Sequence, residues 1–444
     1  MTDYRNPIVY KAIDMAIELG ADQARSILEK DIENSVTVLN NEVDKLMSSS
    51  GSTLFLQLFI DGKYGSFSTN MLREDELRKF IASAIESTRL IARDECRRLP
   101  EEHLYFKGEA ADLAQYDEKI ETLTSKDRIA RAMAVSEEVW GKHKKLLSIE
   151  TEWGDQVEYS AIVDSQGFHG ETLQSNYSIC SNCSIKGRGD EKPESWWYEG
   201  SMFADSLNWH GCSAKALERG LAALNPKKLQ SGRYDIIVEN TVSSKMVSPI
   251  LSALSGGNLQ QGNSFLKDTL GTKMFGENLT LVDRPHTPGM SGSRYFDDNG
   301  IATADRDIIK EGVVSSYFIS DYYALKMNIP ATISAASVLR FGRASEIGEK
   351  EINLQDIMKA MDRGILITDF NGGNYNHATG DFSYGVRGFL FERGVIVHPI
   401  REMNITGNFI HLWNGLLHVG TDGRTCSRWM IPTLAFTNVN FSGI

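Results

Sequence analysis

The side chains best suited to bind a ligand lie in a polar, glycine-containing segment of the C-terminal half, residues 371–383. Five of its hydrogen-bonding residues are the candidates: Asn374, Asn376, His377, Asp381 and Ser383. Loops that present such groups at the edge of a rigid sheet often carry binding residues. In one interpretation these five side chains line a groove for an extended peptide, and Asn374, Asn376, His377 and Asp381 fix its register through the peptide main chain. In the structural alternative, Asp381 and Ser383 satisfy backbone donors in the turn before the next hairpin.

The same segment could also supply a serine-histidine-aspartate arrangement, with Ser383, His377 and Asp381. No nucleophile elbow surrounds Ser383 in the sequence, so this chemistry is not favoured. The glycine-containing stretch 256–262 could cradle a phosphate, but the Lys-Ser/Thr pair that should follow is missing. We predict no catalytic residue and no cofactor for this chain.

Four residues of the first half could hold a zinc ion. Cys180 and Cys183 have the spacing of half a zinc site, and His210 and Cys212 follow them. A second close pair is missing, and residues three apart on a regular strand point to opposite faces. Structural thiols therefore explain these cysteines better. A structural role is also expected for histidines that show no ligand spacing on one helix face: His377, His398, His411 and His418. We predict no metal site.

A β-hairpin follows the polar segment and would position it. Gly388–Phe391 is apolar, Glu392–Gly394 turns the chain, and Val395–Val397 returns before Pro399 ends the strand. β-Branched and aromatic residues favour a pleated surface, and Gly394 can adopt the positive φ of a three-residue hairpin loop. Apolar side chains occupy both faces of these strands, so we expect the hairpin inside a sheet.

The first half of the chain alternates helical and extended patterns. We predict helices over residues 7–19, 77–92, 126–140 and 214–224, and strands over residues 24–28, 36–43 and 54–60. Residues 93–122 are expected to form a surface excursion, and residues 146–202 an antiparallel meander. The predicted fold is α+β, with N-terminal helices on an antiparallel sheet in a domain of residues 1–228. A larger, β-rich C-terminal domain is predicted over residues 229–444.

Composition limits the compartment and the partners. The net charge of -12 argues against nucleic-acid binding, which needs clustered Lys and Arg. The chain has no run of the roughly 20 apolar residues that a membrane-spanning helix requires, so we predict no membrane contact. Five cysteines, an odd number without a dense framework, fit reduced thiols. We expect a cytoplasmic protein.

Four blocks of the sequence resemble the TldD/PmbA family, whose members are also named modulators of DNA gyrase. The Thr379–Ser383 block before a Gly-Phe hairpin is similar to the family's C-terminal signature. The other blocks follow the family's order at residues 262–283, 294–325 and 418–443. Together they cover most of residues 232–444.

The resemblance implies one of two kinds of chain. The TldD-like kind resembles a metallopeptidase: a helix carries His-Glu-x-x-x-His, a later Cys completes the metal site, and the Glu activates a metal-bound water. The PmbA-like kind, also called TldE-like, lacks these ligands and pairs with the first. This sequence has no His-Glu dipeptide, its matching helix region reads Val247–Ser252, and Val419 stands at the position of the cysteine. The resemblance therefore implies a PmbA-like chain.

A PmbA-like chain is expected to be a non-catalytic subunit of a metallopeptidase complex that processes or degrades unfolded peptides. Its partner would be a TldD-like metal-bearing subunit or a second copy of itself in a dimer. Two alternatives stay open: a peptidase that is active by itself as a homodimer, and a regulatory protein that acts on DNA gyrase.

Overall fold

The computed structural model describes residues 6–109, 111–342 and 352–443. Helices and strands are mixed along the chain, which confirms the predicted α+β class. The chain forms two compact units, each built from segments that are distant in sequence. Unit 1 contains residues 1–183, 196–216 and 288–303, and unit 2 contains residues 184–195, 217–287 and 304–444. The division into domains 1–228 and 229–444 stays a prediction.

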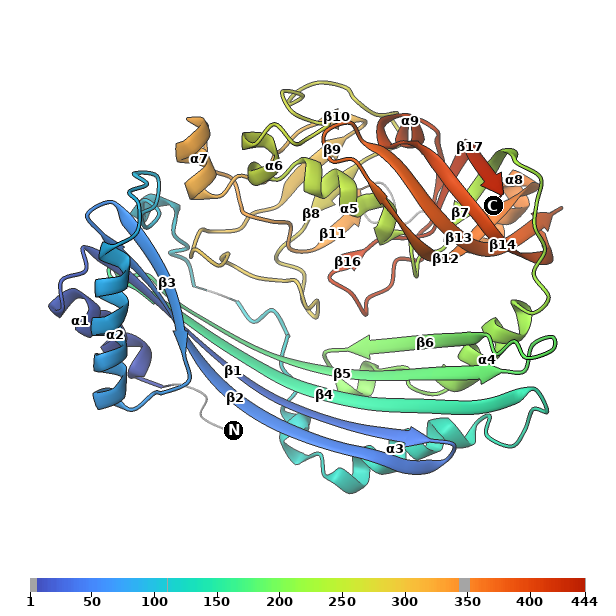
Figure 1. The fold of residues 1–444 in the computed structure, drawn as a ribbon, viewed down its shortest axis with the longest axis horizontal. Helices are drawn as coiled ribbons and strands as arrows, with labels where there is room; N and C mark the ends of the chain where they lie inside the picture. Colours follow the sequence, from blue (N-terminus) through green and yellow to red (C-terminus); the bar gives the residue numbers. More distant parts are fainter. Residues whose placement is uncertain (1–5, 110, 343–351, 444) are drawn as a thin grey trace. The chain divides into compact units, whose positions relative to one another are not determined.

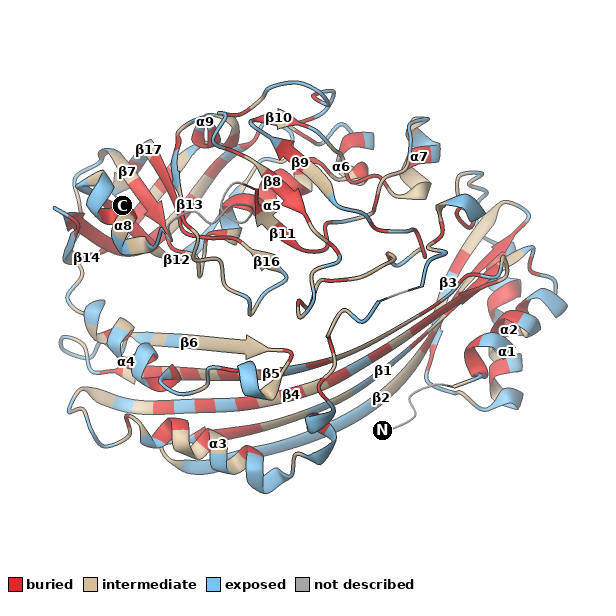
Figure 2. Cartoon of the chain, turned by 180° about the vertical axis from the view of Figure 1, so that it is seen from behind, coloured by how far each residue is buried: buried red, intermediate tan, exposed pale blue. Residues whose placement is uncertain are grey.

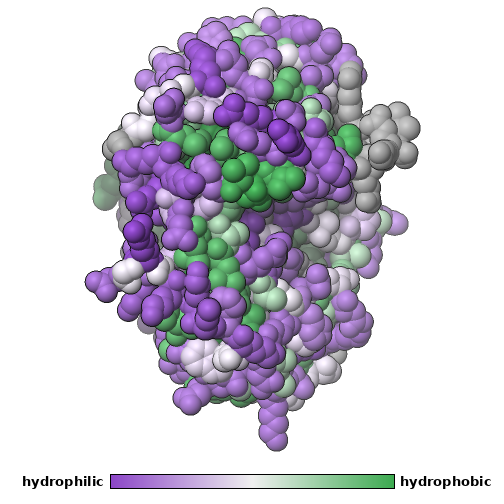
Figure 3. Space-filling view, turned by 90° about the vertical axis from the view of Figure 1, so that its right-hand side faces the viewer, coloured by the Kyte–Doolittle hydropathy of each residue, from purple (hydrophilic) through white to green (hydrophobic). Residues whose placement is uncertain are grey.

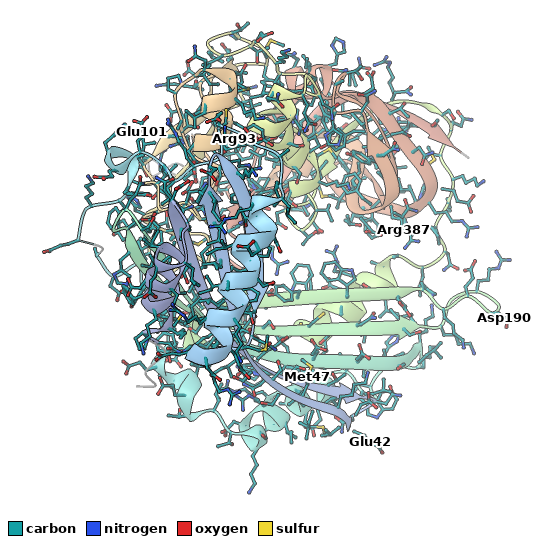
Figure 4. The ribbon with its side chains drawn as sticks, turned by 60° about the vertical axis from the view of Figure 1, so that its left-hand side comes forward. Glu42, Met47, Arg93, Glu101, Asp190 and Arg387 are labelled. Carbon is teal, nitrogen blue, oxygen red and sulfur yellow. The ribbon has the colours of Figure 1, made fainter. Side chains whose placement is uncertain are left out.

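Unit 1 is built on a sheet with the strand order β3-β2-β1-β4-β5-β6. The strands are β1 (Gln23–Leu39), β2 (Glu42–Ile60), β3 (Lys63–Thr69), β4 (Leu146–Asp164), β5 (His169–Ile185) and β6 (Glu194–Ser201). β1 pairs with β2 and β4 along its whole length, so the two strands predicted over 24–28 and 36–43 are one strand. Figure 1 shows these long strands side by side. Glu42 and Met47, labelled in Figure 4, lie near the far end of the β1–β2 hairpin.

Three helices pack on one face of this sheet: α1 (Ile8–Glu18), α2 (Glu74–Arg89) and α3 (Ser125–Glu137). The β1 side chains in the cores beneath them are all even-numbered: Ala24, Leu28, Val36 and Val38. Side chains alternate along a strand, so all three helices cover the same face. The alternation of buried and exposed residues is visible along β4 in Figure 2. Helix α4 (Cys212–Ala222) follows β6.

A buried hydrogen-bond network around Arg25 of β1 holds residues 288–303 against the sheet of unit 1. The Arg25 guanidinium donates to the side-chain and main-chain oxygens of Asn299 at 2.8 and 2.9 Å. It also lies 3.5 Å from Asp164, whose carboxylate accepts from the Tyr105 hydroxyl at 2.6 Å. Arg25 is only 2% exposed, so these partners replace the water that its guanidinium loses on burial.

Unit 2 contains two sheets. The larger has the order β14-β13-β12-β7-β17-β15, and an additional β14–β17 pairing closes five of its strands into a ring. These strands are β7 (Gly232–Val238), β12 (Arg363–Tyr375), β13 (Asp381–Glu392), β14 (Val395–Asn408), β15 (Leu416–Val419) and β17 (Leu434–Gly443). The smaller has the order β10-β9-β8-β11-β16, with β8 (Leu281–Asp283), β9 (Arg306–Lys310), β10 (Val313–Val314), β11 (Leu339–Phe341) and β16 (Trp429–Met430).

Short helices accompany these sheets: α5 (Ser244–Ala253), α6 (Gly256–Gln260), α7 (Asp321–Met327), α8 (Leu354–Met361) and α9 (Phe409–Asn414). Helix α5 packs into the main core of unit 2 together with side chains of both sheets. No helix in the described ranges is both long and apolar enough to cross a membrane.

The predicted hairpin is present as β13–β14 but differs in two details. Glu392 pairs directly with Val395, so the loop has two residues, Arg393 and Gly394, both with positive φ (52° and 71°). This is the pattern of a type I′ turn rather than a three-residue loop. Pro399 does not end the strand: it pairs with Phe389 between two register shifts, and β14 continues to Asn408. The irregular pairing around it explains why a residue without an N–H is tolerated.

The first three residues of β14 leave apolar side chains at the surface. Val395, Ile396 and Val397 are 64%, 45% and 51% exposed. β14 reaches the right-hand side of Figure 1, and Figure 3 shows this side face-on, with apolar groups between polar ones.

Candidate functional site

The polar segment singled out from the sequence forms the end of the β12–β13 hairpin. Residues 371–375 belong to β12 instead of a loop, and only residues 376–380 form the connection. A bulge with positive φ at Gly372 (120°) and Gly373 (104°) displaces the strand just before Asn374. Asn374 then pairs with Ser383 across the hairpin. The glycines that indicated a loop therefore serve a strand irregularity.

The connection is held by its own side chains. The Asn376 side-chain oxygen accepts from the main-chain nitrogens of Ala378 and Thr379 at 2.9 and 3.2 Å. The Asp381 carboxylate accepts from the Thr379 hydroxyl at 2.7 Å and from the Asn408 amide at 2.9 Å. These two hydrogen bonds, the one from Asn408 foremost, lower the pKa of the exposed Asp381. Its partners are side chains, whereas the structural alternative expected backbone donors.

His377 faces a different neighbourhood from Asp381. Its Nδ1 atom lies 3.4 Å from the Ser252 hydroxyl at the end of α5. The same hydroxyl accepts from the Asn258 amide at 3.0 Å, and the His377 ring packs 4.3 Å from the Tyr375 ring. The contacts of His377 and Asp381 therefore do not join them with Ser383 into the serine-histidine-aspartate arrangement.

Asn374 and Ser383 belong to a row of uncharged polar residues. Ser383 pairs with Thr406 on β14, and Thr406 pairs with Asn440 on β17. The Asn440 amide donates to the Thr406 hydroxyl at 2.7 Å. Directly paired residues project from the same side of a sheet, so the row Asn374, Ser383, Thr406 and Asn440 crosses four strands on one face. We call it the polar row.

The structure thus divides the five predicted residues into three groups. Asn374 and Ser383 belong to the polar row, Asn376 and Asp381 hold the connection by hydrogen bonds, and His377 contacts α5. Thr406, Asn440 and Ser252 were missed from the sequence. The alternation of polar and apolar residues at 438–441 indicates a strand with one polar face, but no sequence pattern gives the cross-strand register.

The cysteines lie in interior or half-buried positions. The Cys212 thiol is 3.3 Å from the main-chain oxygen of Trp197, and the Cys183 thiol is 3.9 Å from that of Ser213. Burial raises the pKa of Cys183 and of Cys212 to about 12. These two thiols therefore keep their protons at neutral pH and are weak nucleophiles.

Comparison with known proteins gives the relationship. Residues 231–443 match the PmbA/TldA metallopeptidase C-terminal domain, and residues 27–88 match the PmbA/TldA metallopeptidase domain 1. A solved structure named as a modulator of DNA gyrase, from Bacteroides thetaiotaomicron, is 43% identical over 100% of both chains, with a TM-score of 0.96. The chain belongs to the PmbA/TldD family.

Two more distant family members cover almost the whole chain. Metalloprotease PmbA of Escherichia coli O157:H7 is 25% identical over 443 residues, which is 98% of this chain and 96% of the relative. The structure of TldE from Thermococcus kodakarensis is 19% identical, covers 98% of this chain and 100% of that one, and has a TM-score of 0.81. It shares the fold.

The metal that a metallopeptidase family implies can be tested against the residues present here. Val247 of α5 is fully buried in the main core of unit 2, and Val419 of β15 packs against the same core. These are the positions that the resemblance pairs with the first histidine and the cysteine, and neither side chain carries a donor atom. Ser252, at the second histidine position, bonds with His377 and Asn258. The ligand set does not fit a metal, and the described ranges contain no other group of three His, Cys, Asp or Glu residues placed to hold one.

Proposed function

We propose that this chain is the non-catalytic, PmbA-like subunit of a cytoplasmic metallopeptidase complex. It would pair with a TldD-like subunit that carries the metal and help to hold unfolded peptides for processing or degradation. The observation that carries this proposal concerns the positions of two metal ligands in TldD-like chains. Val247 and Val419 occupy these positions here; Val247 lies in the hydrophobic core of unit 2, and Val419 packs against that core. The likeness in fold to TldE supports it.

The contribution to peptide binding rests on the end of the β12–β13 hairpin. Asn374 and Ser383 present an amide and a hydroxyl from adjacent strands, and both groups can pair with the main chain of any extended peptide. Asn376 and Asp381 would act by fixing the connection, and His377 by linking it to α5. Recognition of the main chain suits substrates that are unfolded and varied in sequence.

The decisive experiment compares the chain alone with a mixture that contains a TldD-like subunit with an intact His-Glu-x-x-x-His motif. We expect the dialysed chain to bind no stoichiometric zinc and to digest no unfolded peptide. The mixture should bind zinc and digest the peptide, and a Glu→Gln change in the partner's motif should abolish digestion. About one zinc per chain together with digestion by the chain alone would refute the proposal.

A peptidase that is active by itself is the second candidate, and the contact between Ser252 and His377 favours it. A serine hydroxyl beside an imidazole is the minimum needed for an activated nucleophile. Ser252→Ala separates the candidates. In the subunit proposal the mixture with Ser252→Ala still digests the peptide in a zinc-dependent way, at a rate lowered by the lost link to His377, whereas in the second candidate the change abolishes activity of the chain alone.

A further inference from the structure

Arg340 of β11 carries a charge that no carboxylate of the described residues neutralises. The side chain is half-buried, and its Nε atom is buried without a hydrogen-bond acceptor. Across the described part of the chain, no carboxylate lies within ion-pair distance of Arg340. Burial first, and then the positive charge of Arg284, lower the pKa of Arg340. An unpaired cation in such a place costs free energy unless a ligand compensates it.

The charged side chains near Arg340 form ion pairs with one another. Arg340 pairs in register with Val282 of β8, and Val282 pairs with Asp307 of β9, so all three side chains share one side of the smaller sheet. Asp307 lies 3.8 Å from Arg284 and 3.6 Å from Lys310.

Arg284 has a second carboxylate close by. Its Nε atom lies 3.6 Å from Asp305. Arg306 pairs in register with Asp283 and so projects from the opposite side of the sheet. On the side of Arg340, the carboxylates Asp305 and Asp307 therefore lie close to Arg284 and Lys310. Neither of these two carboxylates lies within ion-pair distance of Arg340.

We propose that Arg340, with Arg284 beside it, binds a carboxylate of the peptide substrate. The planar guanidinium fork matches the two oxygens of a carboxylate, and the positive potential of Arg284 adds to the attraction. The group bound is the C-terminal carboxylate or an Asp or Glu side chain. This inference rests on the proposed peptide-binding role and assigns part of its specificity to the smaller sheet.

The test uses the intact isolated chain and calorimetric titration of three N-acetylated Gly/Ser hexapeptides. One has a free C-terminal carboxylate, one a carboxamide, and one a carboxamide with a single Asp. We expect the free acid to bind the unmodified chain at least tenfold more tightly than the plain amide. Tight binding of the Asp peptide as well identifies the ligand as any peptide carboxylate, and its absence identifies the C-terminus.

Arg340→Gln should weaken binding of the free acid about tenfold and abolish the preference over the amide. Arg363→Gln is the matched control, because Arg363 is 65% exposed and pairs with the exposed Glu392 at 3.3 Å. It should leave the preference unchanged. Arg340→Lys, which keeps the charge but loses the fork, is the second variant if Arg340→Gln does not fold.

Equal affinity for acid and amide, no binding of any peptide, or an unchanged preference in Arg340→Gln would overturn the inference. The titration needs no partner and no proteolysis. If the mixture with a metal-bearing subunit fails to digest peptides while the acid preference persists, the proposed function fails and the carboxylate site stands.

Discussion

The bulge before Asn374 allows a stability prediction with a built-in control. A Cβ added at Gly373 would lie 2.1 Å from the main-chain oxygen of Ser383, which cannot move without displacing β13. A Cβ added at Gly372 would meet no atom within 4 Å. Both glycines have a positive φ, so alanine at either position is strained by about 1–3 kcal/mol. Only Gly373→Ala adds the steric conflict, about 1–3 kcal/mol more.

The difference between the two variants is therefore the cost of pushing β12 and β13 apart. For a unit of this size, about 2–4 °C of melting temperature corresponds to 1 kcal/mol, so Gly373→Ala should melt roughly 2–12 °C below Gly372→Ala. Calorimetric melting of both variants measures this, and hydrogen exchange at Ser383 should rise only in Gly373→Ala. Equal melting temperatures would show that the backbones of β12 and β13 do not approach closely at Gly373, and would refute this reasoning.

Three further outcomes can be measured. Iodoacetamide at pH 7 should alkylate the half-buried Cys96 before Cys183 and Cys212, because burial raises the pKa of both of the latter; peptide mass mapping gives the order. Asp381 has a pKa below its usual value in the folded chain, so its stabilisation is present above about pH 4 and is lost as the pH falls through the lowered pKa. The melting temperatures of the protein and of Asp381→Asn should accordingly differ between pH 7 and 5 and converge below pH 4. Light scattering of the chain alone should give the mass of a dimer at micromolar concentration. A monomer mass would count against the prediction that two copies of this chain pair when the partner is missing.

Local patterns predicted the helices well and the long strands poorly. The apolar periodicity of residues 7–19 corresponds to α1, and that of residues 77–92 overlaps α2, since each helix buries one stripe on the sheet. The centre of β1, residues 29–35, is half-exposed and polar, so its sequence carries no buried face to reveal a strand. Pairing with β2 and β4 on both sides decides its conformation instead.

The candidate site was predictable as a location but not as a geometry. The run of polar residues and glycines before an apolar hairpin marked residues 371–383. Cross-strand partners such as Thr406 and Asn440 lie far away in sequence, and their approach depends on the β14–β17 pairing that closes the ring. Among the described residues, the lack of a carboxylate beside Arg340 likewise depends on where Asp305 and Asp307 point, which no spacing encodes.

The insertion of residues 288–303 into unit 1 has a consequence for synthesis on the ribosome. Arg25 emerges early, but its partner Asn299 is translated 274 residues later, after residues 184–195 and 217–287 of unit 2. At about 5–20 residues per second, unit 1 waits on the order of 15–55 s for its last segment while Arg25 lacks that partner. Unit 1 therefore cannot complete its native packing until residue 303 has been translated, whereas unit 2 at that time still lacks residues 304–444.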